Sequence, residues 1–173
     1  MDRYTVISSD CHAGLPPALY RDYLDPEFRE TFDLALPMQK AMTDKSEEIF
    51  LLKDINDDWR EGVQAHLTGA WDYQERLNVL DGDGIAGEII FPDGITQQNA
   101  PPFGAGLALP TKNIVADLQW AGARAHNRWL AELCDLLCTR TYTFFRDFPV
   151  SLPLTQVTVG RPKPLEHAPL QGR

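Results

Sequence analysis

The sequence carries a carboxylate and an imidazole two residues apart near its N-terminus, at Asp10 and His12. Residues i and i+2 of an extended chain point to the same side, so both side chains can face one ion. A carboxylate oxygen and an imidazole nitrogen suit Zn²⁺, with manganese as the alternative metal. The same residues also fit a plain turn, in which Asp10 caps the turn and His12 is a surface residue beside Gly14 and Pro16.

The residues before this pair are typical of a buried β-strand. Residues 4–9 read YTVISS, a run rich in β-branched and aromatic side chains. This strand is predicted to end at Asp10, which begins a loop. Ligands of parallel α/β sheets gather at the carboxyl ends of strands, so the position favours the metal interpretation.

Prolines open the next segment. Pro16 and Pro17 predict the start of a short helix, PALYRDYL, which Asp25-Pro26 ends. Residues 27–69 are polar and weakly periodic, without a convincing strand. Such a long excursion is either a functional lid or an insertion with helices of its own.

A helix and a strand follow this excursion. Asp72 is predicted to cap the helix together with Glu75, and Gly82 with Gly84 to stop it. GEIIF, residues 87–91, predicts a second strand that Pro92 closes.

The clearest helical pattern covers residues 112–137. One apolar stripe recurs there every three or four positions, at Ile114, Leu118, Ala121, Ala125, Trp129, Leu133 and Leu136. Strand, loop, helix, strand, loop and helix in this order predict an α/β fold built from βα units around a parallel sheet. Tyr142 to Phe145 could add a third strand.

Three segments together resemble the amidohydrolase-2 family of the amidohydrolase superfamily. YTVISSDCHAGLPPALYRDYLDPEFRE is similar to the family's opening strand, metal motif and proline-bearing loop. HNRWLAELC, residues 126–134, is similar to a Y-N-x-W-L-x-x-F-C helix end. The most specific segment resembles R-L-x-x-M-D-x-x-G-I-x-x-x-V-I-F-P through Arg76, Leu77, Asp81, Gly84, Ile85, Ile89, Ile90, Phe91 and Pro92.

This resemblance implies a partial (β/α)₈ barrel of the TIM-barrel kind over residues 1–138, with Asp10 and His12 as two metal ligands. It implies a metal-dependent hydrolase, or a related nonoxidative decarboxylase, that acts on a small-molecule substrate through a metal-activated water. Members of the family take further ligands from later strands, usually two histidines and an aspartate. Because a complete barrel needs roughly 250 residues, we expect a truncated form. The catalytic residues are left unassigned, and whether the chain is an active enzyme stays open.

The last 35 residues differ from the rest. Residues 139–173 hold five basic and two acidic side chains and five of the thirteen prolines. We expect an irregular, divergent tail there, disordered in part. The alternative function is therefore a noncatalytic interaction remnant that needs no metal. Exposed sheet edges of a partial barrel would favour a homo-oligomer or low stability.

Composition excludes several classes of protein. The net charge of −9 argues against a nucleic-acid partner, and no apolar run reaches the length of a membrane span. Three cysteines, Cys11, Cys134 and Cys138, form no disulfide framework, and they fit a reducing cytoplasm. His126 is expected at the edge of the core, and His66 in a solvated loop. His167 matches no ligand motif.

Overall fold

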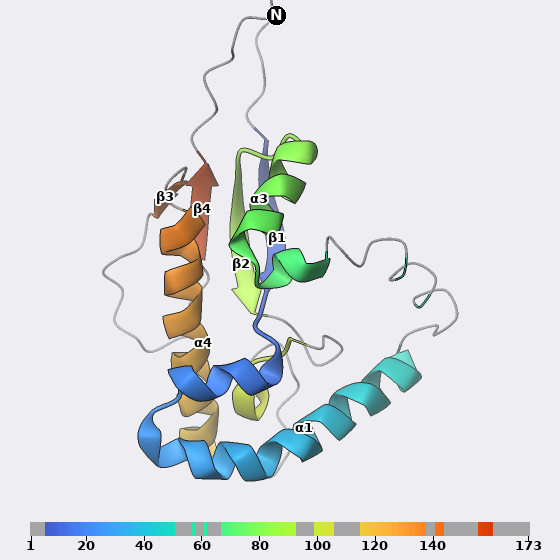
Figure 1. Ribbon diagram of the computed structural model, residues 1–173, viewed down its shortest axis with the longest axis vertical. Helices are drawn as coiled ribbons and strands as arrows, with labels where there is room; N and C mark the ends of the chain where they lie inside the picture. The colour runs from blue at the N-terminus through green and yellow to red at the C-terminus, as the bar shows by residue number, and fades with distance from the viewer. Residues whose placement is uncertain are drawn as a thin grey trace, which may run out of the picture.

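The computed structural model describes residues 6–50, 57, 61, 67–92, 99–105, 115–137, 141–143 and 156–160 of the 173-residue chain. These residues form a mixed α/β fold (Figure 1). His66, His167, Cys138 and Ile114 lie outside the described residues.

A four-stranded sheet carries the fold. Its order is β1-β2-β4-β3, with β1 at Ile7–Ala13, β2 at Gly87–Pro92, β3 at Thr141–Thr143 and β4 at Gln156–Gly160. β1 and β2 are parallel, whereas β4 pairs antiparallel with both β2 and β3. The strand predicted at 142–145 corresponds to β3, and its partner β4 also lies within residues 139–173.

Strand β1 differs from the prediction at both ends. It begins at Ile7 and continues to Ala13, so Asp10 and His12 lie in the strand and not in a loop after it. The strand continues because Cys11, His12 and Ala13 pair with β2 in register. That partner is 80 residues away in the chain and is invisible to local propensity. The pairing shifts register between Ser8 and Cys11.

Helix α3, Tyr73–Gly82, follows the prediction closely. The Asp72 side chain accepts a hydrogen bond from the Glu75 amide at 2.9 Å, which satisfies one amide of the first turn. Gly84 follows the helix with φ +70°, a conformation that costs glycine little. The chain then enters β2 at Gly87, as the sequence indicates.

The chain between β1 and α3 is helical in most of its described part. η1 (Pro17–Tyr23) and η2 (Pro26–Phe28) are 3₁₀ helices, and α1 (Arg29–Phe50) is an α-helix that contains Pro37. The described part of residues 27–69 therefore has helices of its own. Figure 1 shows η1 and α1 beyond the carboxyl ends of β1 and β2.

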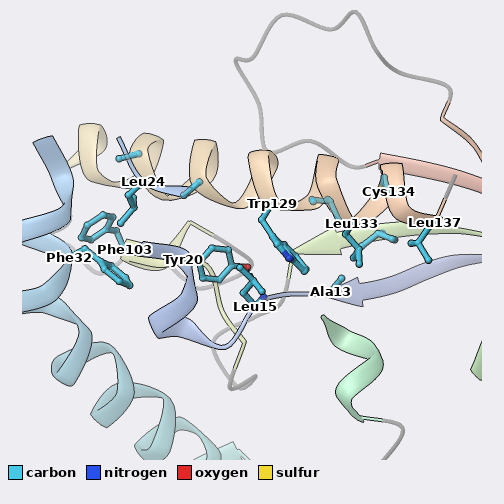
Figure 2. Close-up of a cluster of buried hydrophobic side chains, with 14 residues drawn as sticks. Ala13, Leu15, Tyr20, Leu24, Phe32, Phe103, Trp129, Leu133, Cys134 and Leu137 are labelled. Carbon is cyan, nitrogen blue, oxygen red and sulfur yellow. The ribbon is translucent and has the colours of Figure 1, made fainter. Parts of the chain in front are cut away.

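Helix α4, Ala116–Leu137, packs against the sheet and supplies half of the buried core residues (Figure 2). Four positions of the predicted stripe are buried: Ala121, Ala125, Trp129 and Leu133. At the end of the stripe, Leu137 is buried and Leu136 is 49% exposed. The buried face is wider than one stripe because η1 and η4 (Pro102–Gly104) also contact α4.

Within the described residues, no helix is long and apolar enough to cross a membrane. Cys134 is buried and Cys11 is partly buried.

Candidate metal centre

The two faces of the β1–β2 pair have different environments. Ala13 and Ile90 are fully buried in the core with α4, and Glu88 is buried against Arg76 of α3. Since successive side chains of a strand alternate between faces, the neighbouring residues point the other way. His12 and Phe91 lie side by side on that second face, with ring centroids 6.1 Å apart.

Asp10 and His12 converge on this second face. Their side chains approach to 3.6 Å between Asp10 Oδ1 and His12 Nε2. The Asp10 side chain is 81% exposed and the His12 side chain 35% exposed. Both belong to the last four residues of β1, so the pair lies at the carboxyl end of the strand, as the sequence predicts.

The other ring nitrogen of His12 fixes which atom faces Asp10. His12 Nδ1 lies 2.9 Å from the main-chain oxygen of Pro92, which can only accept a hydrogen bond. Nδ1 therefore carries the hydrogen, and in the neutral ring Nε2 has a free lone pair directed towards Asp10. Histidines that bind metals typically donate their second N–H in this way, because it fixes the tautomer and the ring orientation.

The separation of the two donor atoms fits a shared ion. Nitrogen and oxygen ligands of zinc lie about 2.1 Å from the metal, so two ligands at a tetrahedral angle are about 3.4 Å apart. The 3.6 Å between Asp10 Oδ1 and His12 Nε2 is close to that value. A lone pair and a carboxylate at this distance also repel each other unless a cation, either a proton or a metal ion, lies between them.

Two donors are all that the described residues bring together. No group of three or more histidine, cysteine, aspartate or glutamate side chains suited to a metal occurs in that part of the chain. Cys11 lies between the two ligands in sequence but donates its thiol hydrogen to Ser8 Oγ at 3.0 Å. Burial raises the pKa of the Cys11 thiol, and Glu88 contributes to the same increase.

A buried ion pair supports the backbone of the motif, and it was not foreseen from the sequence. Arg76 donates to both carboxylate oxygens of Glu88, at 2.6 and 2.8 Å, and the two side chains are 8% and 2% exposed. Its third nitrogen donates to the main-chain oxygens of His12 at 3.2 Å and Gly69 at 2.9 Å. One guanidinium thus ties α3 to β2, to β1 at the candidate ligand and to the turn before the helix.

A second buried polar group lies beside α4. His126 is buried, and its Nδ1 is 2.8 Å from the hydroxyl of Tyr20, which accepts a hydrogen bond from the Leu15 amide. His126 Nε2 has no hydrogen-bond partner in the described residues. Burial lowers the pKa of His126 to about 4, so the ring is neutral near pH 7. The sequence predicts His126 at the edge of the core, and the structure buries it further, with 2% of its surface exposed.

A salt-bridge cluster joins the link between η1 and η2 to α4. Asp25 accepts hydrogen bonds from Arg124 and Arg128. Although burial raises the pKa of Asp25, these two arginines hold it below its usual range. Beside the cluster, Tyr23 donates to Glu132 at 2.7 Å; burial, with help from Glu132, raises the pKa of Tyr23 to about 12.

An open surface pocket of about 790 Å³ lies at this cluster, away from Asp10 and His12. Asp25 and Arg128 in its lining are paired with each other, and Glu132 is paired with Tyr23. It is lined by Asp22, Tyr23, Leu24, Asp25, Pro26, Arg128, Ala131 and Glu132.

Comparison of the chain with protein-family profiles, with curated proteins and with solved structures gave no match.

Proposed function

We propose that this chain is the N-terminal part of a metal-dependent hydrolase of the amidohydrolase type, in which Asp10 and His12 hold a divalent metal, preferably zinc. The observation that carries the proposal is the arrangement of His12. Its Nδ1 is engaged with Pro92, and its Nε2 is left 3.6 Å from Asp10 Oδ1. This is the orientation that a metal-binding histidine needs.

The arrangement of the elements supports a (β/α) barrel as the parent fold. β1 and β2 are parallel, α3 precedes β2 and α4 follows it. Residues that contact the two helices are on one face of the strands, and the candidate ligands are on the other, as between the outside and the inside of a barrel. Strand β4 lies antiparallel on β2, where a closed barrel would have its next parallel strand.

Each residue has a defined part in this site. Asp10 and His12 bind the ion, and the Pro92 carbonyl orients the imidazole. Arg76 donates to the main-chain oxygen of His12 and so fixes the position of the His12 backbone relative to α3. A bound zinc would supply Lewis acidity and lower the pKa of a coordinated water. The substrate is a small molecule, and the reaction is hydrolysis or nonoxidative decarboxylation. The three cysteines, an odd number without the arrangement of a disulfide framework, suit a reducing cytoplasm.

The second candidate is a noncatalytic interaction module with the same ancestry. The observation in its favour is that only two donors converge in the described residues. A module needs no metal, so substitution of Asp10 and His12 would leave its behaviour unchanged.

Metal titration distinguishes the two functions. We expect the purified chain to bind Zn²⁺ or Mn²⁺ in calorimetry and in competition with a chromogenic chelator. Binding should be lost in Asp10→Asn and in His12→Gln and retained in Asp135→Asn, which alters an exposed acid of α4. The metal-loaded chain is then assayed with activated esters and amides, and for CO₂ release from small carboxylic acids. Absence of metal binding in the unaltered chain would overturn the hydrolase proposal and leave the module.

A further inference from the structure

Helix α1 has two apolar faces, of which one packs against η1, η2 and η4 and the other is exposed. Phe32 and Thr43 are buried on the packed face. On the other face, Leu34, Met38 and Met42 are 78%, 67% and 39% exposed. Figure 1 shows the C-terminal half of α1 extending away from η1, so a second molecule can reach the exposed face.

The exposed residues Leu34, Met38 and Met42 form one ridge on the helix. They are four positions apart in sequence, so they follow one another along a single row of the helix surface, and packed helices interdigitate along such rows. Ile49, 63% exposed, continues the same face towards the end of α1. Methionine side chains are flexible and adapt to irregular contacts. An apolar row with charged residues at its rim marks a surface that binds another protein.

Charged residues at the two ends of the ridge make it complementary to itself. Glu30 precedes the ridge and Lys45 follows it, and both side chains are exposed. They are about 22 Å apart along an α-helix, so they cannot pair within one copy. At 3.6 residues per turn, both lie on the same side of the ridge. A two-fold axis perpendicular to two antiparallel helices brings like sides together, so Glu30 of each copy meets Lys45 of the other.

We propose that two copies of this chain associate through α1, as an antiparallel helix pair with the two-fold axis beside Met38. Met38 lies close to the midpoint between Glu30 and Lys45, so this axis also places Leu34 of each copy against Met42 of the other. The contact has two equal ion pairs around a buried apolar centre. Because it is isologous, it closes at the dimer. It uses no metal and does not rest on the proposed function.

The size and charge of the contact predict a weak dimer. A single helix face covers less than the roughly 800 Å² per partner of a standard interface. The net charge of −9 on each copy also opposes association. The dimer should therefore form and dissociate with concentration, and the ion pairs determine its register.

Sedimentation velocity of the full chain over a range of concentrations tests the proposal, with a chelator present to exclude association through metal ions. We expect a monomer–dimer equilibrium. Met38→Glu places two carboxylates at the two-fold axis and should weaken dimerisation by about tenfold or more. Leu19→Glu is a matched control at a leucine of η1 that is 52% exposed, and it should leave dimerisation unchanged.

Exchange of the two charges tests the register. Glu30→Lys and Lys45→Glu should each weaken dimerisation by about tenfold, because each variant places like charges at both ion pairs. The double variant with Glu30→Lys and Lys45→Glu should dimerise as the unaltered chain does. A mixture of the two single variants should also form dimers, because opposite charges face each other again.

A chain that stays monomeric at every concentration would overturn the proposal, and so would a dimer that persists in Met38→Glu. Failure of both the mixture and the double variant to dimerise would exclude the antiparallel register. Circular dichroism melts distinguish a lost contact from lost folding, because exposed substitutions should leave the melt of the monomer nearly unchanged.

Discussion

His12 Nδ1 donates a hydrogen bond to the main-chain oxygen of Pro92 at 2.9 Å and thereby points Nε2 at Asp10. The contact joins the carboxyl ends of two parallel strands, since His12 is in β1 and Pro92 ends β2. The orientation of the candidate ligand thus depends on the second strand as well as on its own.

This contact allows the two nitrogens of His12 to be tested separately. In His12→Asn, the amide NH₂ can occupy roughly the place of Nδ1 and keep the bond to Pro92, but no donor atom replaces Nε2. We expect zinc affinity to fall at least tenfold, as losses at metal sites commonly do. The free energy of unfolding should change by only about 0.5 kcal/mol, as at a surface position. Calorimetry and urea unfolding measure the two effects, and an unchanged affinity would exclude Nε2 as a ligand.

Arg76 and Glu88 provide the second prediction. Arg76→Met leaves the Glu88 carboxylate buried without its partner, and it removes the donors to His12 and Gly69. Breaking a buried pair from one side typically costs about 3–5 kcal/mol. The double substitution Arg76→Met with Glu88→Leu removes both charges and should recover a large part of that loss. Urea unfolding of both variants tests this; equal destabilisation would show that the ion pair itself is not the cause.

The sequence was sufficient to locate an element whose ends are determined by residues of its own segment. Asp72 caps the start of α3, and Gly84 adopts a positive φ just after its end, so the helix could be located without knowledge of its neighbours. The stripe of α4 was visible for the same reason. In contrast, β1 extends through Asp10 and His12 because β2 pairs with it. A strand boundary set by a distant partner cannot be found from propensity.

The candidate site was foreseen in part. The spacing of Asp10 and His12 was enough to predict that they face the same side, and their atoms do approach each other. The Pro92 carbonyl could not be foreseen, because a main-chain acceptor has no signature in the sequence. Arg76 belonged to the family-like segment, but its burial against Glu88 depends on how α3 packs on the sheet. The only available hint was an acidic residue inside the apolar run GEIIF.

Buried His126 predicts a loss of stability in acid. Its pKa of about 4 in the folded chain is below the usual 6.5, because burial disfavours the charged ring. Between these pH values the unfolded chain binds a proton that the folded chain does not, so the free energy of unfolding falls as pH decreases. The contribution is complete above pH 6.5, and about 3 kcal/mol of it is lost by pH 4.

The His126 contribution is measured by difference. In His126→Asn the side-chain oxygen can occupy roughly the place of Nδ1 and accept from Tyr20, but the group does not titrate. Unfolding by urea at several pH values from 7 to 4 should give a shallower decline for the variant, by up to about 1.4 kcal/mol per pH unit. Carboxylates common to both proteins cancel in the comparison. Parallel curves would mean that His126 is protonated in the folded chain as easily as in the unfolded one.

Gly122 and Gly82 form a matched pair for the last prediction, because both are helical glycines with opposite surroundings. A Cβ on Gly122 would lie 2.1 Å from the main-chain oxygen of Pro102, whereas a Cβ on Gly82 has nothing within 4 Å. Alanine in place of a helical glycine gains up to about 1 kcal/mol from propensity. At Gly122 that gain is opposed by a backbone clash that must displace η4, and overpacking of this kind costs about 1–3 kcal/mol or more. Phe103 of η4 has φ 56° and packs edge-on against Phe32, so a shift of η4 would also disturb this contact.

We therefore expect Gly122→Ala to lower the melting temperature and Gly82→Ala to leave it unchanged or raise it slightly. Equal melting temperatures for the two variants would mean that α4 and η4 are not held as closely as the structure has them.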